Sequence, residues 1–418
     1  MNGNAAQRHL SVARRPVIAL VVPALVEGGG VRAVADFIAR GIERTGAYDL
    51  RCFSLAMWSR DRSSVRLRDP RSWRGVQSFI GDWCGRPYTH VGTWMAEIEF
   101  MRYRPRKALR AVLAGCDLIQ VVCGSPAWAN AVLGLGKPIS VHVATRARIE
   151  RHMRDTHPRG LSARWRRRMT AMTDFLDDRA LSQVDAIQVM NPWMLDYAHK
   201  LNADRDVDLC LAPPGVNTEL FRPSSRRTPQ REPYILCVAR LDDPRKHIGL
   251  LLEAYARLPA VVRGKVRLVL AGSSGPGDTF WQRAEVLGLR ERVGYVARPG
   301  RDALVRLYQE ASVFALPSDE EGFGMVLLEA MACGVPVIST RSGGPDGIIT
   351  DGEDGYLVPR DDAEALSSRL ARLLQDPDLN VVMGLRARQT IERRYDERVA
   401  GEVFVEMWDR LVRKSGAA

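Results

Sequence analysis

Two carboxylates stand eight positions apart in the segment DEEGFGMVLLEAMACGVPVIST, which covers residues 319–340. Glu321 lies in a polar, glycine-containing stretch, whereas Glu329 is flanked by apolar residues on both sides. Burying a carboxylate without a partner costs on the order of several kcal/mol, unless its pKa shifts and it becomes neutral. Glu329 is therefore expected either to pair locally within a core helix or to bind a ligand.

Two cations flank a second stretch of the chain. Arg240 directly follows an apolar strand pattern, and Lys246 stands six residues later, just before an apolar helix pattern. Cations at the carboxyl edge of a sheet suit the phosphates of a diphosphate ligand. For the neighbouring Arg245 and His247, a solvated basic loop remains an alternative explanation.

The residues after Glu321 predict a helix over 325–333 that is closed by Gly334 and Pro336. The open amino terminus of a helix carries partial positive charge and free backbone N–H groups. The groups expected to cradle a phosphate here belong to Gly322, Phe323, Gly324, Met325 and Val326. A phosphate site beside carboxylates that accept hydrogen bonds from hydroxyls is the combination that a nucleotide sugar requires.

The elements that must position these residues follow an α/β pattern. Continuous apolar strands alternate with amphipathic helix patterns, which is typical of a parallel sheet covered on both faces. The strands are expected within 17–23, 50–56, 116–123, 138–145 and 184–191, and again within 234–240, 266–272, 293–297, 312–317 and 335–340. The chain is thus predicted to form two Rossmann-like, doubly wound units.

A polar, proline-bracketed segment, RPSSRRTPQREP at 222–233, is the best linker candidate. We therefore predict one Rossmann-like domain over 1–222 and a second over 223–395, for which a family resemblance implies the roles of acceptor domain and nucleotide-sugar donor domain. The helical segment 396–418 is expected to pack back toward the first domain. Two such halves facing each other form a central cleft, with ligands bound outside the carboxyl ends of the strands.

Taken together, four segments resemble the retaining glycosyltransferases of family 4 (glycosyl transferases group 1), which have the GT-B fold. The segments are LAPPGVNTELFRP, ARLDDPRKHIGLLLEA, the E-x7-E stretch of the opening segment, and SGGPDGIITDGEDGYLV. The resemblance implies that Arg240 and Lys246 bind the donor phosphates. It also implies that Glu321 binds hydroxyls of the transferred sugar and Glu329 those of the ribose.

The sequence departs from the family pattern at a few positions. Ala239 and His247 each replace a glycine, on either side of the two cations, and Asp346 replaces a glutamate. Pro214 and Asn217 alter the common form of the segment before the linker. None of these changes removes a charged donor contact, so they bear on specificity rather than on the class of reaction.

In the first domain, three glycines separate the first strand from its helix: Gly28, Gly29 and Gly30. Glycines here allow close backbone approach to a phosphate, and the resemblance places the donor phosphates at this loop. With Ala33 they also satisfy G-x-G-x-x-A, the dinucleotide fingerprint. An NAD site needs an acid at the far end of the second strand, but Asp49 precedes that strand, which disfavours this alternative.

His142 ends another first-domain strand. A lone histidine is commonly a structural residue, yet the resemblance offers a catalytic place near the sugar, so both interpretations stay open. The other histidines lack metal-ligand spacing, and no paired carboxylates end a strand. We therefore expect metal-independent catalysis without a cofactor. Seven scattered cysteines without a C-x-x-C motif predict reduced thiols rather than disulfides or a zinc site.

The formal net charge is +12, carried mainly by arginine, which favours an anionic partner. Residues 145–168 are densely basic and contain Trp165, so they are a candidate surface for an anionic membrane or a lipid-linked pyrophosphate acceptor. The alternative is a solvated helix face whose arginines pair with nearby acids. Nucleic acid is not expected as a partner, because no recognised binding module accompanies the charge.

No apolar run approaches the roughly 20 residues that cross a bilayer. We expect a cytoplasmic protein, with peripheral association at the inner face of the plasma membrane. The leading hypothesis is a retaining, hexosyltransferase-type enzyme that moves a sugar from a GDP- or UDP-linked donor to a glycan or lipid-linked hydroxyl, in bacterial cell-surface glycan assembly. The alternatives are a catalytically silent anionic-lipid or glycan-binding protein and an NAD-dependent sugar-nucleotide enzyme.

Overall fold

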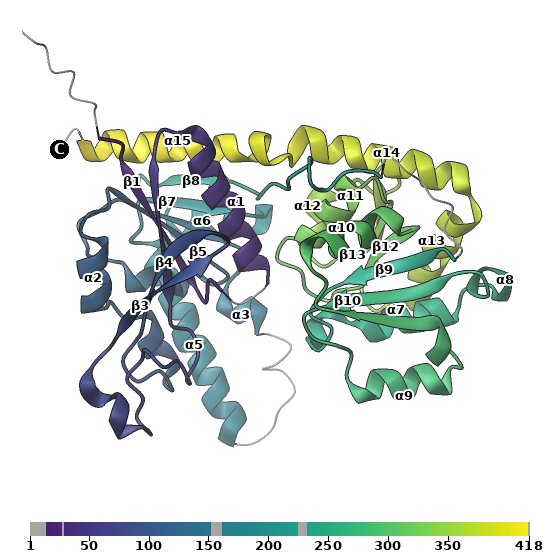
Figure 1. Cartoon of the computed structure of the whole chain (residues 1–418), viewed down its shortest axis with the longest axis horizontal. Coiled ribbons are helices and arrows are strands. Elements are labelled where there is room, and N and C mark those ends of the chain that lie inside the picture. The colour runs from purple at the N-terminus through teal and green to yellow at the C-terminus, as the bar shows by residue number, and fades with distance from the viewer. Residues whose placement is uncertain (1–13, 27–28, 152–160, 225–231, 417–418) are drawn as a thin grey trace, which may run out of the picture.

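The computed structural model describes residues 14–26, 29–151, 161–224 and 232–416. Two α/β units lie side by side, and two long helices near the carboxyl terminus run across both of them (Figure 1). Each unit is built on its own sheet, as the alternating strand and helix patterns predict. The predicted α/β class with two Rossmann-like domains is therefore confirmed.

The first sheet has eight strands in the order β3-β4-β2-β1-β5-β6-β7-β8. Its strands are β1 (Val17–Pro23), β2 (Asp49–Leu55), β3 (Ser78–Trp83), β4 (Arg86–Val91), β5 (Leu118–Cys123), β6 (Ile139–Val143), β7 (Ala186–Val189) and β8 (Asp208–Leu211). Its helices are α1 (Gly30–Thr45), α2 (Lys107–Leu113), α3 (Ala147–Glu150), α5 (Leu161–Leu181) and α6 (Pro192–Leu201). Strands β1, β5, β6 and β7 are buried along their whole length, as expected for the centre of a sheet covered on both faces.

One edge of this sheet departs from the predicted parallel pattern. Strand β3 runs antiparallel to β4, and both follow a long excursion from β2 over residues 56–77. The excursion contains the short helix η1 (Pro70–Arg74), which Asp69 caps by accepting a hydrogen bond from the Arg71 N–H. Most residues of β3 are exposed, and its sequence lacks the continuous apolar run that marks the inner strands of the sheet.

The second sheet has six parallel strands in the order β11-β10-β9-β12-β13-β14. They are β9 (Tyr234–Val238), β10 (Arg267–Gly272), β11 (Val293–Ala297), β12 (Val313–Leu316), β13 (Val337–Thr340) and β14 (Gly355–Val358). Its helices are α7 (Ile248–Ala256), α8 (Ala260–Arg263), α9 (Asp278–Val286), α10 (Arg301–Glu310), α11 (Met325–Ala332), α12 (Pro345–Ile348) and α13 (Ala363–Gln375). Strands β9 and β12 lie at the centre, where the order of the sheet reverses, so the loops after them share one carboxyl edge.

The last two helices, α14 (Pro377–Arg394) and α15 (Glu397–Gly416), connect the two units. Helix α14 packs on α11, whereas α15 packs on α1 of the first unit. The Trp408 indole on α15 donates a hydrogen bond of 2.8 Å to the buried Gln120 side chain on β5. Arg40 on α1 pairs with Glu397 at 3.0 Å. The carboxyl-terminal helix is thus fixed to the first sheet by packing, a buried hydrogen bond and an ion pair.

Within the described ranges, no helix combines the length and apolar composition that crossing a bilayer requires. All seven cysteines are free thiols.

Candidate active site

Lys246 and Glu321 lie in contact at the carboxyl edge of the second sheet. Lys246 ends the short helix η4 (Pro244–Lys246) after β9, and Glu321 lies in the loop after β12. The Lys246 Nζ and Glu321 Oε2 atoms are 2.5 Å apart, and each side chain is only about 15% exposed. Because β9 and β12 are neighbouring parallel strands, the sheet itself brings together two residues that are 75 positions apart in the sequence.

Asp243 organises the loop that carries the predicted phosphate-binding cations. Its carboxylate accepts hydrogen bonds from the Arg245 backbone N–H at 3.1 Å and from the Arg245 guanidinium at 2.8 Å. Arg240 also reaches Asp243, at 3.1 Å, and its side chain stays 53% exposed. This local pairing shapes the loop while leaving Arg240 accessible to an anionic ligand.

The backbone of Glu321 is held from both sides by the loop after β13. The Glu321 N–H donates to the Ser342 carbonyl at 3.0 Å, and the Gly344 N–H donates to the Glu321 carbonyl at 2.8 Å. A Cβ atom at Gly344 would lie 2.4 Å from Cα of Phe323. Only glycine permits this approach, so the segment 342–344 after β13 holds the backbone of Glu321 in place.

The amino terminus of α11 has the features of an anion site. Gly324, the residue before the helix, has a φ of +106°, and no side chain among the described residues caps the first turn. Gly322, Met325 and Val326 are partly exposed, whereas Phe323 is buried against Tyr395. Free N–H groups and the helix dipole at this end favour a bound anion.

Glu329 has a partner within the second domain. Its Oε2 atom accepts a hydrogen bond of 2.7 Å from the Tyr308 hydroxyl on α10. Burial raises the pKa of Glu329 to about 7, and the Tyr308 hydrogen bond opposes that rise. The residue as a whole is nevertheless not completely enclosed. Glu329 thus pairs locally, which was one of the two expectations. It also keeps part of its surface exposed, as the other expectation, ligand binding, requires.

The first domain reaches this site through its own loops. Asn191, after β7, donates hydrogen bonds of 3.0 Å to the Ala144 carbonyl and to the Gly322 carbonyl of the second domain. A Cβ atom at Gly322 would lie 3.5 Å from Cβ of Ala144. The carboxyl edges of the two sheets therefore meet at the loop that carries Glu321.

The predicted glycine loop lies after β1 in the same domain. Gly29 has a φ of +128°, a conformation that favours glycine. Gly30 begins α1, and a Cβ atom added there would meet no other atom within 4 Å. Gly28 lies outside the described residues. Strand β2 is followed by Ala56 and Met57, so the acid that an NAD site needs is missing at its carboxyl end.

His142 occupies a core position rather than an open site. It is fully buried on β6, its Nε2 lies 2.9 Å from the Ala212 carbonyl oxygen, and its ring packs on Phe404 of α15. Burial lowers the pKa of His142 to about 4, so the ring is neutral near pH 7. This geometry argues against the predicted catalytic role, because a substrate has no access to the imidazole.

Glu320 is a residue that the sequence reasoning missed. Burial raises its pKa to about 7; Arg245 opposes the rise and Glu150 adds to it. Glu150 belongs to α3 of the first domain, and it lies 3.6 Å from the Arg245 guanidinium. Glu320 is the second acid of the segment DEEGFG, which is visible in the sequence. The effect of Glu150 on it depends on how the two domains meet, which the sequence does not show.

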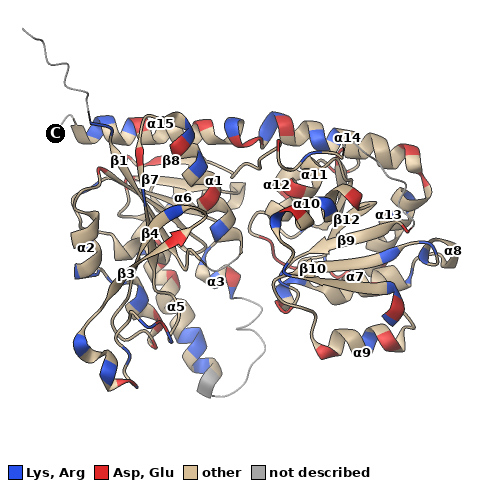
Figure 2. Ribbon diagram, in the orientation of Figure 1, with Lys and Arg blue, Asp and Glu red and all other residues tan. Residues whose placement is uncertain are grey.

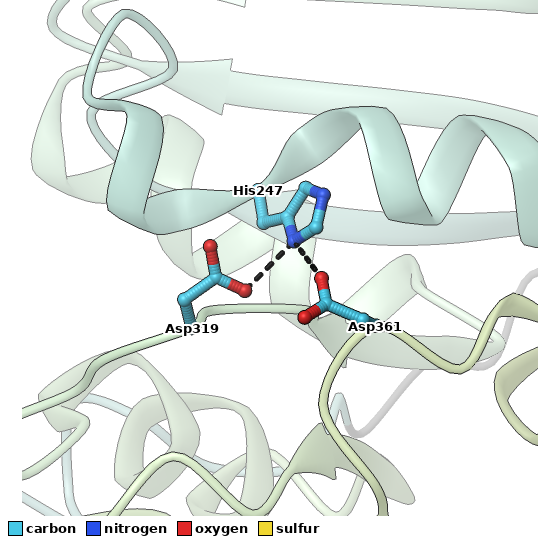
Figure 3. Close-up of side chains that lie close together, drawn as sticks. All are labelled: His247, Asp319 and Asp361. Carbon is cyan, nitrogen blue, oxygen red and sulfur yellow. Dashed lines mark hydrogen bonds and ion pairs between the residues drawn. The ribbon is translucent and has the colours of Figure 1, made fainter. Parts of the chain in front are cut away.

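His247, Asp319 and Asp361 converge beside Lys246 (Figure 3). The His247 Nδ1 atom lies 2.7 Å from Asp319 Oδ1 and 3.2 Å from Asp361 Oδ1. The hydrogen bond to Asp319 raises the pKa of His247; burial opposes this effect, and the charges of both aspartates add to it. Among the described residues, these three form the one group whose ligand atoms are close enough to hold a metal ion.

The predicted basic membrane segment divides into paired and exposed parts. Arg146 pairs with Asp174 and Asp178 at 2.9 and 2.8 Å, in agreement with the alternative of a helix face whose arginines pair with acids. Trp165, on α5, is 59% exposed, and three arginines beside it are also exposed: Arg164, Arg167 and Arg168. Residues 152–160 of this segment lie outside the described residues.

The second domain carries a family signature. Residues 220–390 match the family model described as "Glycosyl transferases group 1". The second domain is therefore similar to the members of this family. The group 1 domain contains both acids of the E-x7-E pair and both predicted phosphate-binding cations.

Curated relatives match part of the chain. A D-inositol 3-phosphate glycosyltransferase of Saccharomonospora viridis is 36% identical over 194 residues, which cover 43% of this chain and 45% of the relative. A GDP-mannose-dependent alpha-(1-6)-phosphatidylinositol monomannoside mannosyltransferase of Mycolicibacterium smegmatis is 33% identical over 211 residues, covering 47% of this chain and 54% of the relative. The chain thus spans about half the length of the curated relatives it matches.

Solved structures match over nearly the whole chain. A sucrose-phosphate synthase from Thermosynechococcus elongatus superposes with a TM-score of 0.73 at 22% identity, covering 96% of this chain and 100% of the other. HepE of Anabaena, solved with UDP-glucose, gives a TM-score of 0.67 at 16% identity, covering 94% and 99%. These neighbours are GT-B glycosyltransferases, and the predicted GT-B fold is therefore confirmed.

Proposed function

We propose that the protein is a retaining, family 4 hexosyltransferase that moves a sugar from a nucleoside diphosphate donor to a hydroxyl group of an acceptor. The observation that carries the proposal is the Lys246–Glu321 contact at the carboxyl edge of the second sheet, next to the open amino terminus of α11. A cation, an anion-binding helix end and a carboxylate together suit a ligand with phosphate at one end and hydroxyls at the other.

Donor binding exchanges partners within this contact. Lys246 turns from Glu321 to the diphosphate, which frees the Glu321 carboxylate to accept hydrogen bonds from hydroxyls of the transferred sugar. Arg240 and the amino terminus of α11 add positive charge around the same phosphates. Glu329 accepts hydrogen bonds from the ribose hydroxyls, and Gly29 and Gly30 let the first-domain backbone approach the donor.

In the transfer step, the bond between the anomeric carbon and the diphosphate oxygen breaks, and a bond forms to the acceptor oxygen on the same face of the sugar. The acceptor proton passes to a diphosphate oxygen, and the nucleoside diphosphate leaves. Lys246, Arg240 and the helix terminus stabilise the negative charge that grows on the leaving oxygen. Removing one such fixed donor typically lowers the rate by about 100-fold or more.

The names of the relatives suggest which donor base and which class of acceptor to propose. The printed name of the Mycolicibacterium smegmatis relative specifies GDP-mannose, and the HepE structure holds UDP-glucose, so GDP- and UDP-linked sugars are the donors to test first. Both curated relatives are named for phosphate-bearing inositol acceptors. We propose a glycan or lipid-linked acceptor in bacterial cell-surface glycan assembly, reached from the cytoplasmic face of the plasma membrane.

Metal-independent catalysis remains part of the proposal. Lys246, Arg240 and a helix terminus offer the diphosphate the positive charge that a divalent ion would otherwise supply. The His247, Asp319 and Asp361 group could hold an ion beside this site, so the proposal needs a test with chelator present.

The deciding experiment is calorimetric titration of the protein with UDP, GDP and ADP in EDTA, followed by transfer assays with sugars of the base that binds. Tight binding of one nucleotide and turnover without metal are the expected results. Binding without transfer to any acceptor would favour the catalytically silent binding protein. Absence of binding in EDTA, restored by a divalent ion, would overturn metal independence.

A further inference from the structure

The excursion between β2 and β3 carries a concentrated positive charge. Residues 60–74 contain six arginines but only two aspartates. Asp61 is already engaged, with its carboxylate 2.8 Å from His90 Nε2 and accepting a hydrogen bond from Ser64. Asp69 pairs with Arg66. Glu97 of the same domain accepts hydrogen bonds from the Leu67 and Arg68 N–H groups. The segment still carries an excess of arginines over these acids.

Four of these arginines surround a surface hollow of about 610 Å³. Its charged and polar lining consists of Arg60, Arg62, Ser64, Arg66, Asp69, Arg71, Ser72 and Gln77. Within the described part of the chain, Arg60, Arg62 and Arg71 have no acidic partner, and the buried Nε atom of Arg66 has no hydrogen-bond partner. Converging guanidinium groups with hydroxyl and amide groups between them suit a phosphate group.

The hollow is built before any ligand arrives. The Arg66 N–H donates to Ser72 Oγ at 2.8 Å, and the Trp73 indole donates to the Arg66 carbonyl at 2.9 Å. The Gln77 N–H donates to the Ser63 carbonyl at 2.8 Å. These bonds fix the two ends of the excursion against each other, so an anion would meet arginines that are already assembled.

Large apolar side chains surround the same region. Six of them are at least 44% exposed: Trp58, Leu67, Trp73, Phe79, Ile80 and Trp94. Tryptophans are favoured at membrane interfaces, where an apolar ring and a polar N–H group each find a matching environment. Exposing large apolar side chains to water is unfavourable, and burying them in the interface of a bilayer relieves this cost. The arginines between them are attracted to the negative charge of anionic lipids.

This surface is separate from the proposed donor site. Strands β3, β4 and β2 form one side of the first sheet, whereas the loops that contact the second domain follow β6 and β7 on the other side of β1. The excursion lies at the lower left of the first unit, with basic residues along it, on the side away from the second unit (Figure 2). Its charge and aromatic residues are therefore not accounted for by the nucleotide sugar.

We propose that residues 56–80 and Trp94 form a docking surface for an anionic phospholipid membrane. The phosphate of a lipid headgroup occupies the arginine hollow, and Trp58, Trp73 and Trp94 enter the interfacial layer around it. The surface does not depend on the donor assignment, since it shares no residue with that site. It differs from the basic segment 145–168 in having a preformed hollow with a ring of exposed tryptophans.

Vesicle co-sedimentation tests the proposal, with phosphatidylcholine vesicles compared with vesicles that contain equal amounts of phosphatidylglycerol. The full chain should bind the anionic vesicles, and raising the salt concentration should weaken binding. Each arginine near an anionic surface contributes about fivefold in affinity, so R60Q/R62Q/R71Q should weaken binding by roughly 100-fold. W73A should also weaken it, because the indole loses its place in the interface.

The matched control is R306Q/R386Q/R393Q, which removes the same charge from exposed positions of the second unit. This control should bind vesicles as tightly as the parent does. Amide hydrogen exchange of the parent should slow within residues 58–80 when vesicles are present. Equal weakening by both triple variants would mean a response to net charge alone and would overturn the proposal. Tight binding of inorganic phosphate that vesicles do not displace would overturn it as well, since the hollow would then serve a soluble ligand. Nucleotide titrations of R60Q/R62Q/R71Q should match the parent, which separates this result from any failure of the donor site.

Discussion

The Lys246 Nζ atom lies 2.5 Å from Glu321 Oε2, so the two charges proposed to bind the diphosphate and the adjoining sugar of the donor neutralise each other when no donor is bound. The pair keeps two partly buried charges satisfied in the free protein. It also sets a requirement for catalysis, because the diphosphate must replace Glu321 as the partner of Lys246. Activity should therefore depend on both residues in different ways.

Lys246→Ala should lower kcat by about 100-fold or more, because it removes a cation that stabilises the leaving diphosphate. Nucleotide affinity should fall as well, measured by calorimetry with the nucleoside diphosphate that binds the parent. Lys265→Ala is the control, since Lys265 is exposed on the second domain away from this loop. Turnover within a few-fold of the parent would remove Lys246 from the phosphate site.

Glu321→Gln should separate sugar contacts from phosphate contacts. Nucleotide affinity should be retained or rise, since Lys246 no longer has a competing carboxylate, whereas kcat with the sugar donor should fall by roughly 10-fold or more. The comparison requires the nucleotide and the intact donor to be titrated in parallel. A loss of nucleotide affinity equal to the loss of turnover would place Glu321 at the phosphates instead.

Much of this site follows from residue types that the sequence displays. Arg240, Lys246 and Glu321 follow strands β9 and β12, and Glu329 lies in the helix after β12. The carboxyl edge of a parallel sheet must collect such positions. The β3–β4 edge does not follow in the same way, because an exposed strand such as β3 has no apolar run to reveal it. Partners far apart in the chain, such as Asn191 and Gly322, depend on how the two domains meet.

His142 shows why strand position alone misleads. It lies next to the last residue of β6, whereas Arg240 lies two residues past the end of β9. Helix α15 covers the His142 ring with Phe404, and the Ala212 carbonyl lies beside its ring nitrogen. The covering helix comes from the end of the chain, and no local pattern around His142 indicates it. Arg240 has no such cover and remains exposed.

Glu329→Gln should change the pH dependence of stability. The pKa of Glu329 is raised by burial to about 7, against an ordinary value of 4.5, so this group contributes stability at acidic pH that is lost as pH rises through the folded-state pKa. The amide keeps an acceptor for the Tyr308 hydroxyl without the buried charge. Melting curves should therefore show the variant stabilised at pH 8, by up to about 3 kcal/mol, and nearly unchanged at pH 5. An advantage of equal size at both pH values would contradict the proposed ionisation.

His247→Gly should change the pH dependence of stability in the same direction, because both groups have a raised pKa, but its effect should appear at low pH rather than at high pH. Asp319 and Asp361 raise the pKa of His247, so its ion pairs contribute stability below its ordinary pKa of 6.5, and that contribution is lost as pH rises through the folded-state pKa. Glycine fits the backbone, because His247 has a φ of +42°. The parent should thus be the more stable protein at pH 6, with the difference fading at pH 9. A difference that persists in alkaline solution and disappears with EDTA would indicate a bound metal ion instead.

Gly344→Ala tests whether the loop after β13 supports the Glu321 carboxylate. The added methyl group would lie 2.4 Å from Cα of Phe323, whereas the same change at Gly347, three residues later, meets no atom within 4 Å. Gly344→Ala should therefore lower the free energy of unfolding by about 1–3 kcal/mol and reduce turnover, because the backbone on either side of Glu321 must move. Gly347→Ala should leave both quantities close to those of the parent. Denaturant unfolding and donor turnover, measured on both variants, check the prediction. Two equally affected variants would mean that helix α12 as a whole, rather than the close contact of Gly344 with Phe323, sets the position of Glu321.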